Sequence, residues 1–337
     1  MHYFVTGHTG FKGSWLIVLL KALGHTVSGY ALTPPEGGLF VGGGLESDLY
    51  QHTIGDIRNQ EKLQAALSDA NPDVVIHLAA QPLVLRSYED PIETYTTNVN
   101  GTLNLLEAVT SLSTQPTLLV VTTDKVYKDT GKGVYSESDP LGGHDPYSAS
   151  KAMADILTQS WAATHENMVI HVARAGNVIG AFDVSQNRLI PDIKLAIESN
   201  VPLVTRHPDA VRPWQHVLDC LSGYLAFIDA AREGVKLPVA LNFGPDPEGL
   251  RAVSDVIATA SVAFPTLQVQ RSSSETPKET SLLTLDSGKA KAHLGWANVL
   301  GFEESVLNSL FLQGGNYRSE SFDAADNFLR LRQPTGE

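Results

Sequence analysis

The sequence predicts an α/β fold in which a doubly wound parallel sheet is followed by a smaller C-terminal lobe. Short apolar runs rich in β-branched residues alternate with amphipathic stretches as far as about residue 175, a pattern typical of parallel strands joined by helices. A glycine-rich turn directly follows the first apolar run, and beyond residue 175 the alternation becomes irregular. We therefore expect a sheet domain at 1–175 and mainly a second lobe at 176–337, with segments near 214–243 returning to the sheet domain.

Six strands and four helices are expected in the sheet domain. The apolar runs place the strands at 3–6, 26–31, 52–55, 74–78, 117–122 and 168–174. Helical periodicity places the helices at 12–23, 59–70, 91–112 and 147–165. Further along the chain we expect a strand near 240–243 and a short helix at 323–331. The stretch 34–44 is rich in Gly and Pro, which predicts a mobile loop.

Composition and charge exclude several classes of protein. With 42% hydrophobic and 18% charged residues, the chain has the composition of a soluble globular protein. The apolar run at 15–20 ends at Lys21, far short of the ~20 residues of a membrane span. A strand is expected from His2 onward, which leaves no room for a signal peptide, so we expect a cytoplasmic protein with no membrane partner. The formal charge of −13 argues against a nucleic-acid partner.

Cysteine and histidine usage argues against a metal site. The single cysteine, Cys220, excludes an intrachain disulfide and a cysteine-cluster metal site, and we expect it to pack as a small apolar residue. The eleven histidines include no H-E-x-x-H or similar ligand spacing. No metal is therefore expected.

The glycine-rich turn at 6–13 predicts a phosphate-binding site. Its glycines follow the spacing G-x-x-G-x-x-G, which lets the backbone approach a pyrophosphate while the N-terminus of the next helix stabilises the negative charge. The alternative is a tight strand-to-helix turn without a ligand. Because the turn stands at the first strand-helix junction, we favour a dinucleotide cofactor. Its expected contacts are Gly7, Thr9, Gly10, Phe11, Lys12 and Gly13.

Two further segments fit the same cofactor. Asp56, with Ile57 beside it, is expected to accept a hydrogen bond from an adenine amino group, although Asp56 is also placed to cap a helix. Leu78, Ala79 and Ala80 are small enough for the dinucleotide to lie against them, although close packing alone explains them as well. The segment 31–33 offers neither a carboxylate for a ribose hydroxyl nor an arginine for a 2′-phosphate. We expect NAD, with NADP not excluded.

A tyrosine and a lysine on one helical face predict redox chemistry. Tyr147 and Lys151 are four residues apart in the predicted helix 147–165. A lysine ammonium lowers the pKa of a nearby phenol, which makes the phenol a base for a sugar hydroxyl. The alternative is an aromatic-lysine pair on the protein surface. The preceding glycine turn and alternating strands favour the catalytic interpretation.

An acid and a base follow the fifth strand directly. Asp124 and Lys125 come after the apolar run 118–121, and open α/β sheets place their ligands beyond the carboxyl ends of the strands. As an exposed ion pair the two side chains would contribute only ~0–1 kcal/mol to stability. As an active-site pair they would act on a substrate.

Motifs along nearly the whole chain resemble the extended short-chain dehydrogenase/reductase family, in its nucleotide-sugar branch. The longest ones resemble the 4,6-dehydratases that act on CDP-glucose: HTGFKGSWL from His8, LAAQPLVLRSY from Leu78, TTDK from Thr122, DPLGGHDPYSASK from Asp139, RLIPD from Arg188 and RPWQHVLD from Arg212. The resemblance implies a Rossmann-type NAD-binding domain, a substrate-binding C-terminal lobe and a role for Asn98 in cofactor binding. It also implies a lyase of deoxysugar biosynthesis.

The resemblance also implies roles for the pair after the fifth strand. Such enzymes oxidise the sugar at C4, eliminate water across C5 and C6, and reduce C6. Here Lys125 would take the C5 proton and Asp124 would protonate the leaving hydroxyl, while Thr123 would hydrogen-bond the C4 oxygen. Both roles need the neutral forms, which burial favours. A 4-epimerase, or a dehydratase for another nucleotide sugar, is the alternative function.

Substrate contacts follow from the remaining motifs. Asn177 and Arg212 resemble ligands of the nucleotide pyrophosphate, and a guanidinium binds phosphate oxygens through paired hydrogen bonds. Arg188 and His216 lie in surrounding segments, although Arg188 also fits an exposed charge at a helix start. Gln81 and Arg86 are expected on the sugar side.

The pattern is broken at 181–184, where the family usually has Gly-Gly-Asp-Trp, and the loop 128–133 is shorter than expected. The resemblance also implies a homodimer or higher homo-oligomer, formed through the helices at 91–112 and 147–165.

Overall fold

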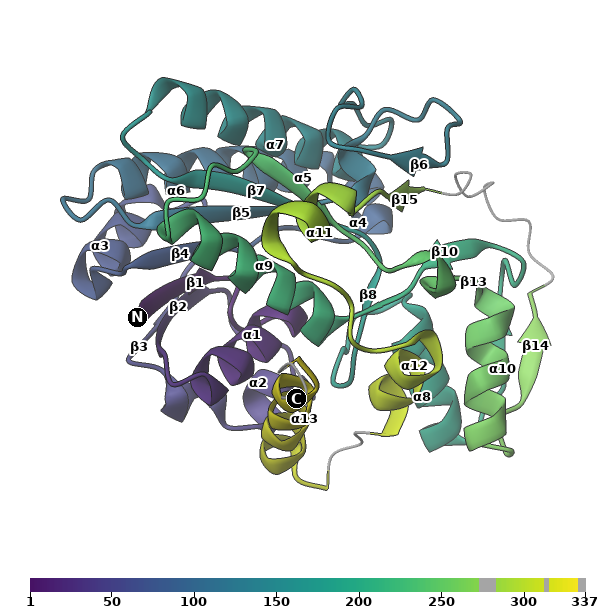
Figure 1. Ribbon diagram of the computed structural model, residues 1–337. Helices are drawn as coiled ribbons and strands as arrows, with labels where there is room; N and C mark the ends of the chain where they lie inside the picture. Colours follow the sequence, from purple (N-terminus) through teal and green to yellow (C-terminus); the bar gives the residue numbers. More distant parts are fainter. Residues whose placement is uncertain (273–282, 312–314, 333–337) are drawn as a thin grey trace, which may run out of the picture.

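A seven-stranded parallel sheet runs through the N-terminal part of the molecule (Figure 1). The structure is a computed structural model that describes residues 1–272, 283–311 and 315–332. In spatial order the strands are β12 (Ala240–Phe243), β7 (Ile170–Ala175), β5 (Thr117–Thr123), β4 (Val74–His77), β1 (His2–Thr6), β2 (Thr26–Ala31) and β3 (Gln51–Ile54). All neighbours pair in parallel. The predicted doubly wound parallel sheet is confirmed.

Helices cover both faces of this sheet (Figure 1). One face carries α1 (Phe11–Ala22), α9 (Val217–Arg232), α11 (Gly288–Leu294) and α13 (Tyr317–Arg332), and the other carries α3 (Gln60–Ala70), α6 (Gly101–Thr110) and α7 (Pro146–Thr164). On the first face Trp15, Tyr224 and Phe243 belong to one buried cluster. On the second face Leu63 and Leu105 belong to another. The strands read as continuous apolar runs because both of their faces are buried.

The predicted helix at 91–112 is a composite of three segments. It consists of α5 (Pro91–Tyr95), a π-turn (Thr96–Asn100) and α6. The Asp90 side chain accepts a hydrogen bond from Glu93 N at the start of α5, and Pro91 occupies the first turn. A further short helix, α4 (Val84–Glu89), precedes it. Such π-turns occur frequently at functional sites, and this one carries Asn98.

The expectation of a mobile loop at 34–44 is wrong for its second half, which contains a short helix. There α2 (Leu39–Gly42) is followed by a 3-10 turn, η1 (Leu45–Asp48). Leu39 and Phe40 are 2% and 3% exposed and pack into the same cluster as Trp15. Burial of these side chains orders a segment whose glycines and prolines alone would predict a loop.

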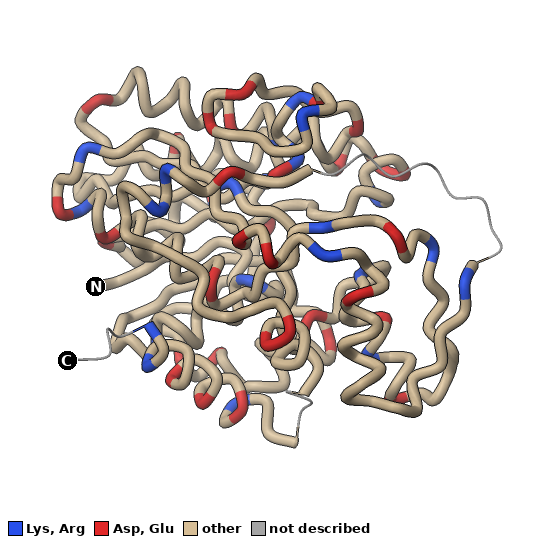
Figure 2. Tube along the Cα trace, turned by 45° about the vertical axis from the view of Figure 1, so that its right-hand side comes forward, with Lys and Arg blue, Asp and Glu red and all other residues tan. Residues whose placement is uncertain are grey.

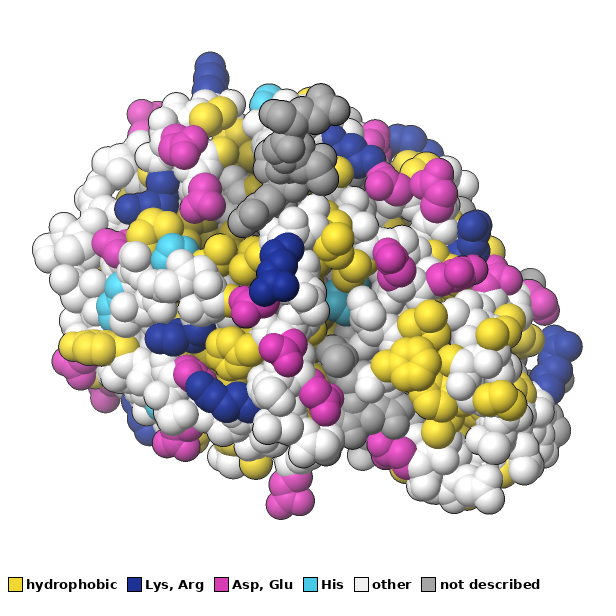
Figure 3. All heavy atoms as spheres, turned by 60° about the horizontal axis from the view of Figure 1, so that its bottom comes forward, with side chains coloured by type: hydrophobic (Ala, Val, Ile, Leu, Met, Phe, Trp, Pro, Cys, Tyr) yellow, Lys and Arg dark blue, Asp and Glu magenta, His cyan; other side chains and the backbone are white. Residues whose placement is uncertain are grey.

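The C-terminal part forms a smaller unit with its own apolar cluster. Its helices are α8 (Leu189–Ser199), α10 (Val253–Ala263) and α12 (Phe302–Phe311). Ile193, Val256 and Leu310 are fully or almost fully buried among these helices. Two strand pairs complete it, β9 (Leu203–Thr205) with β14 (Val269–Arg271), and β10 (Val211–Pro213) with β13 (Leu250–Ala252). Figure 3 shows hydrophobic side chains gathered on the outer face of this unit.

Short strand pairs connect the two parts. β8 (Val178–Ile179) pairs with β11 (Gln215–His216), and β6 (Val134–Tyr135) pairs with β15 (Thr284–Leu285). A 3-10 turn, η3 (Asp124–Val126), follows β5, and another, η4 (Pro247–Gly249), precedes β13. The last five residues of the expected second domain, 333–337, lie outside the described residues.

Charged residues of both signs are interspersed along the described chain (Figure 2). In that same part of the chain, no helix has the length and apolar character that crossing a membrane requires.

Candidate active site

The carboxyl ends of three neighbouring strands bring the candidate residues together. β1 lies between β4 and β2, and β4 lies next to β5. The chain leaves β1 toward β2 on one side, while β4 lies on its other side, so a crevice is expected beyond the ends of β1 and β4. The glycine turn follows β1, Leu78 follows β4, and Asp124 follows β5.

The glycine turn needs its glycines for steric reasons. Gly7 has a φ of +74°, and a Cβ there would lie 2.7 Å from Ala79 N at the end of β4. A Cβ on Gly13 would collide with the Gly7 carbonyl oxygen. A Cβ on Gly10 would come no closer than 3.4 Å to a neighbouring atom. Gly7 and Gly13 therefore hold the turn together, whereas Gly10 leaves room above it.

The same turn fits an anionic group. Gly10 is the N-cap residue of α1, no side chain caps that helix end, and its first turn has no acidic residue. The N–H groups and the positive end of the helix dipole favour a negative charge at this point. The sequence, the steric requirements and the uncapped helix end all fit a dinucleotide pyrophosphate.

Substituting Gly13 and Gly10 by alanine is expected to give different results. Gly13→Ala should lower the free energy of unfolding by about 1–3 kcal/mol, because the turn must open to relieve a backbone clash. Gly10→Ala should leave thermal stability nearly unchanged while weakening NAD binding, because its methyl group points into otherwise open space. Thermal unfolding and calorimetric titration with NAD measure the two effects. Equal melting temperatures for the two variants would contradict this account.

Three other residues of the turn are held by distant elements. Thr9 Oγ1 donates to Leu32 O, 3.0 Å away at the end of β2. Phe11 packs against Gly180, where a Cβ would lie 3.0 Å from its ring. Lys12 Nζ donates to Tyr224 Oη on α9 at 3.3 Å. The Lys12–Tyr224 contact was not predicted, because 212 positions separate the two residues.

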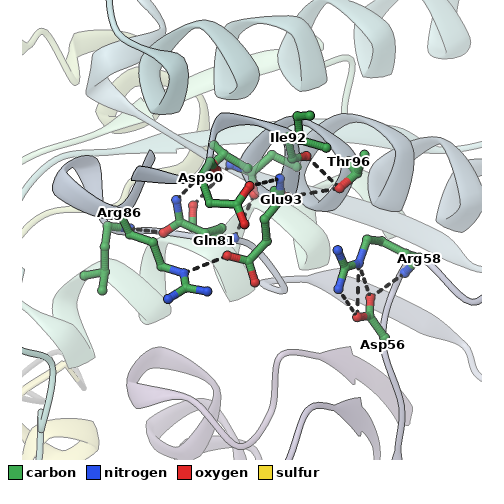
Figure 4. Close-up of polar contacts among 11 residues, drawn as sticks. Asp56, Arg58, Gln81, Arg86, Asp90, Ile92, Glu93 and Thr96 are labelled. Atoms are coloured by element: carbon green, nitrogen blue, oxygen red, sulfur yellow. Dashed lines mark hydrogen bonds and ion pairs between the residues drawn. The ribbon is translucent and has the colours of Figure 1, made fainter. Parts of the chain in front are cut away.

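The remaining expected cofactor residues, apart from Asn98, follow β3 and β4. Asp56 follows β3, and both of its carboxylate oxygens accept hydrogen bonds from Arg58 (Figure 4). Ile57 is buried against Gly101. Leu78, Ala79 and Ala80 are partly buried, and Ala79 N donates to Thr6 Oγ1.

Asn98 is buried inside the π-turn and links three elements. Its Oδ1 accepts from Gln81 N at 2.8 Å, and its Nδ2 donates to Gln81 O and to Ser150 Oγ. Asn98 is 1% exposed. It therefore joins the segment after β4 to helix α7 one residue before Lys151.

A buried acid stands at the end of β5. Asp124 is 6% exposed, and its Oδ1 accepts a 2.8 Å hydrogen bond from Thr123 Oγ1. Burial raises the pKa of the Asp124 carboxyl, against the opposing charge of Lys125 and the hydrogen bond from Thr123. Gly176 leaves space beside the carboxylate, since a Cβ there would lie 3.2 Å from Oδ2. Burial thus shifts the Asp124 pKa in the direction that an acid role would need.

Tyr147 and Lys151 begin α7, whose N-cap residue Asp145 accepts from Ser148 N. Burial, and then the charge of Lys12, lower the pKa of Lys151 to about 8. Burial raises the pKa of Tyr147 to about 12, against the Thr123 hydrogen bond and the Arg188 charge.

The expected lowering of the tyrosine pKa by its lysine is therefore not found. The Lys151 ammonium donates to Val121 O at 2.8 Å, and desolvation of the phenol has the largest effect on the Tyr147 pKa. Hydrogen bonding to Thr123 is the interaction that directly links the phenol to the residues after β5.

Two expected sugar-side residues have protein partners (Figure 4). Gln81 is buried, its Nε2 donates to Thr94 Oγ1, and its Oε1 accepts from Leu83 N. The Arg86 side chain is 51% exposed and pairs with Glu93 at 2.6 Å. Gln81 therefore supports the segment after β4, and Arg86 lies at its outer surface.

The expected nucleotide ligands come from the C-terminal part. Arg188 is the N-cap residue of α8 and pairs with Asp183 at 3.1 Å. Arg212 lies on β10 and Asn177 between β7 and β8, where Asn177 O accepts from Gln215 N. His216 is 2% exposed, and among the described residues its Nε2 has no hydrogen-bond partner. Burial lowers the pKa of His216 to about 4, so its ring is neutral at pH 7.

Within the described residues, no three His, Cys, Asp or Glu side chains form a group that could hold a metal ion. Cys220 is buried, and burial raises the pKa of its thiol.

A family model matches the part of the chain that contains the glycine turn and the Tyr147–Lys151 pair. The model of the NAD dependent epimerase/dehydratase family matches residues 3–244. The chain belongs to this family. Membership in the NAD dependent epimerase/dehydratase family agrees with the fit of the turn to a dinucleotide, and NAD is the cofactor that the family uses.

Curated proteins similar to this chain include dehydratases. A CDP-glucose 4,6-dehydratase of Salmonella typhimurium is 41% identical over 315 residues, which cover 90% of this chain and 88% of the relative. A dTDP-glucose 4,6-dehydratase of Xanthomonas campestris is 27% identical and covers 96% of this chain and 99% of the relative.

Solved structures share the fold of this chain. A dTDP-glucose 4,6-dehydratase of Bacillus anthracis, in complex with NAD, superposes with a TM-score of 0.79 over 95% of this chain and 99% of its own, at 23% identity. A UDP-glucose 4-epimerase of Bifidobacterium longum, in complex with NAD and UDP, has a TM-score of 0.80 at 22% identity, over 95% and 98% of the two chains.

Proposed function

We propose that this chain is a CDP-glucose 4,6-dehydratase, a lyase that converts a nucleotide-activated hexose into its 4-keto-6-deoxy form. The observation that carries the proposal is the buried Asp124 at the end of β5, hydrogen-bonded to Thr123, whose hydroxyl also bonds Tyr147. An epimerase only moves hydrogen at C4 and needs no acid for a leaving hydroxyl. The 41% identity to a CDP-glucose 4,6-dehydratase supports the same substrate.

Each of the proposed acid-base residues carries out a different proton transfer. Bound NAD would supply the hydride acceptor for C4 of the sugar and the hydride donor for C6. Tyr147, as the phenolate that the Thr123 hydrogen bond favours, takes the proton of the C4 hydroxyl, and Thr123 hydrogen-bonds the C4 oxygen. The C5 proton, made acidic by the C4 carbonyl, passes to Lys125, and Asp124 protonates the leaving C6 hydroxyl as water. Lys125 then returns its proton to C5, and the proton gained by Tyr147 balances the one lost by Asp124.

The cofactor and substrate contacts are proposed from the same sequence motifs. Residues 1–175 would form the NAD-binding domain and residues 176–337 mainly the substrate-binding lobe. The uncapped start of α1 supports pyrophosphate binding at the turn. The Arg188 charge acts on Tyr147, which supports a position of Arg188 near the substrate. Because Gln81 and Arg86 have protein partners, we propose that both act by shaping the sugar side of the site.

Incubation with CDP-glucose tests the proposed reaction. The 4-keto product absorbs ultraviolet light in base, and parallel incubations with dTDP-glucose and UDP-glucose establish the nucleotide preference. In deuterium oxide the product should carry deuterium at C5, because Lys125 exchanges its proton with solvent. Formation of a C4 epimer without any keto sugar would contradict dehydration and support the epimerase alternative.

The pKa of Lys151 predicts an alkaline limit to activity. A value of about 8 means that the ammonium is present below about pH 8 and is lost above it. Loss of this charge removes a cation from the buried site in which the C4 hydroxyl gives up its proton, so kcat/KM should fall as the pH rises through about 8. Lys151→Arg keeps a cation well above that pH, and its residual activity should lack this fall. The measurement is kcat/KM from pH 6 to 10, and identical alkaline limbs in both proteins would contradict the assignment.

We also propose that the protein works in the cytoplasm as a homodimer or higher oligomer. Three apolar side chains on α5 and α7 support an interface there: Ile92 is 74% exposed, Met153 47% and Ile156 52%. Exposed apolar side chains on neighbouring helices mark a contact surface when they are contiguous.

A further inference from the structure

One buried arginine connects the elements that carry the proposed acid-base residues. Arg174 lies on β7, and its side chain is 1% exposed. Its Nε and Nη2 donate to the two carboxylate oxygens of Asp155 at 2.8 Å each. Two parallel hydrogen bonds between a guanidinium and a carboxylate fix both distance and orientation. The pair therefore fixes β7 to α7 with a defined geometry.

Asp155 lies on α7 and also contacts β5, so it links the Arg174 side chain to both elements. It lies on α7 one turn after Lys151, so the two side chains share a helix face. Its Oδ2 also accepts a 2.9 Å hydrogen bond from Thr122 Oγ1. Thr122 directly precedes Thr123 on β5, and Asp124 begins the turn η3 that follows. The start of the Thr123–Lys125 segment is thereby tied to the Tyr147–Lys151 helix.

The third nitrogen of the same guanidinium reaches the other end of that segment. Arg174 Nη1 donates to Tyr127 Oη at 2.8 Å, and the guanidinium carbon lies 5.1 Å from the centre of the Tyr127 ring. Tyr127 Oη in turn donates to Asn242 Oδ1 on β12 at 2.7 Å. Tyr127 follows Lys125 by two residues and is 2% exposed. The segment is therefore anchored on both sides, by Thr122 and by Tyr127.

We propose that Arg174 is a positioning residue that holds the Asp124–Lys125 pair in register with the Tyr147–Lys151 pair, so that elimination can follow oxidation in one site. This inference rests on the proposed dehydratase function. Burying an ion pair adds little net stability compared with apolar side chains of similar volume. What the pair supplies is a fixed spacing between the two ends of the Thr123–Lys125 segment and α7, and catalysis is sensitive to such spacing, since a ~1 Å displacement can cost ~10²-fold in rate.

Two tyrosines offer a matched test of this role. Tyr127 and Tyr135 are stacked with ring centres 5.4 Å apart and are 2% and 1% exposed. Tyr127 Oη contacts the guanidinium, whereas Tyr135 Oη accepts from Thr130 N at 2.9 Å. Each Tyr→Phe substitution removes one buried hydroxyl from the same aromatic pair. Only Tyr127→Phe releases the Thr123–Lys125 segment from Arg174.

The test compares both variants with the wild type by kinetics with CDP-glucose and with its C5-deuterated form. Tyr127→Phe should lower kcat about tenfold, short of the ~10²-fold that a full 1 Å displacement can cost, with KM little changed. Its primary isotope effect on kcat should exceed that of the wild type, because removal of the C5 proton by Lys125 becomes slower. Tyr135→Phe should resemble the wild type in both respects. Equal kcat and isotope effects in the two variants would overturn the proposal.

Amide hydrogen exchange provides a second measurement that needs no turnover. Faster exchange across 122–128 in Tyr127→Phe, but not in Tyr135→Phe, is expected from the lost anchor, and equal protection in both would overturn the proposal. Because this measurement is independent of the reaction, it remains decisive if the wild-type protein dehydrates no nucleotide sugar, an outcome that would refute the proposed function alone. Arg174→Lys keeps the positive charge but cannot donate the paired hydrogen bonds to Asp155. Exchange across 122–128 should therefore be faster in this variant as well.

Discussion

Replacing Lys125 by methionine is expected to abolish dehydration while leaving C4 oxidation possible. Methionine keeps the length and apolar packing of the side chain but cannot accept the C5 proton. General-base catalysis contributes ~10²–10⁴-fold, and kcat for the 4-keto-6-deoxy product should fall by about that factor. In deuterium oxide, substrate recovered from the variant should contain no deuterium at C5. The measurement is product formation together with mass spectrometry of the recovered sugar nucleotide.

Lys128→Met is the matched control for this substitution. Lys128 follows Lys125 by three residues and is exposed, so the same chemical change is made beside the site without reaching it. Its turnover should equal that of the wild type. Normal product formation by Lys125→Met would remove the proposed base role, and a loss of activity in both variants would point to the net charge of the loop instead.

Tyr147→Phe is expected to stop the reaction at C4 oxidation, the step before the elimination in which Lys125 acts. Without the phenol, the C4 hydroxyl proton has no acceptor, and oxidation should slow by ~10²–10⁴-fold. The C5 proton becomes acidic only after the C4 carbonyl forms, so deuterium incorporation at C5 should fall by the same factor as product formation. Tyr50→Phe, at a residue that is 72% exposed, is the control and should behave as wild type.

The two substitutions together determine the order of the steps. If C4 oxidation precedes elimination, Lys125→Met should accumulate reduced cofactor when it is mixed with CDP-glucose, and Tyr147→Phe should not. The absorbance of the reduced nicotinamide after mixing reports that oxidation. Exchange at C5 in Tyr147→Phe at the wild-type rate would show that the elimination residues act without prior oxidation, contrary to the proposed mechanism.

Much of the sheet could be predicted from the sequence, because its strands are buried on both faces. Runs such as 74–78 and 117–122 are apolar and β-branched, and the structure places strands there. The helix α2 and the π-turn were not predicted. Leu39 and Phe40 order α2 through burial against distant helices, and the π-turn depends on the side-chain contacts of Asn98. Neither cause leaves a periodic signal in the local sequence.

The candidate site likewise has some features that the local sequence predicts and others that depend on the complete fold. Gly7 and Gly13 follow a short local pattern with a backbone cause, and the structure shows that cause directly. The partners of Lys12, Arg86 and Asp56 depend on which side chains meet after folding, which spacing does not encode. The high pKa of Tyr147 arises from desolvation, a property of the whole surrounding fold.

The position of β12 at the edge of the sheet has a consequence for biosynthesis. β12 pairs with β7 although 64 residues separate Ala175 from Ala240. Until residue 243 has left the ribosome, β7 is an open edge strand, and unpaired edges promote aggregation. Asn242, the partner of Tyr127, is also still missing at that stage. A chain that stops at residue 175 is therefore expected to aggregate, whereas one that extends past β12 can close its sheet.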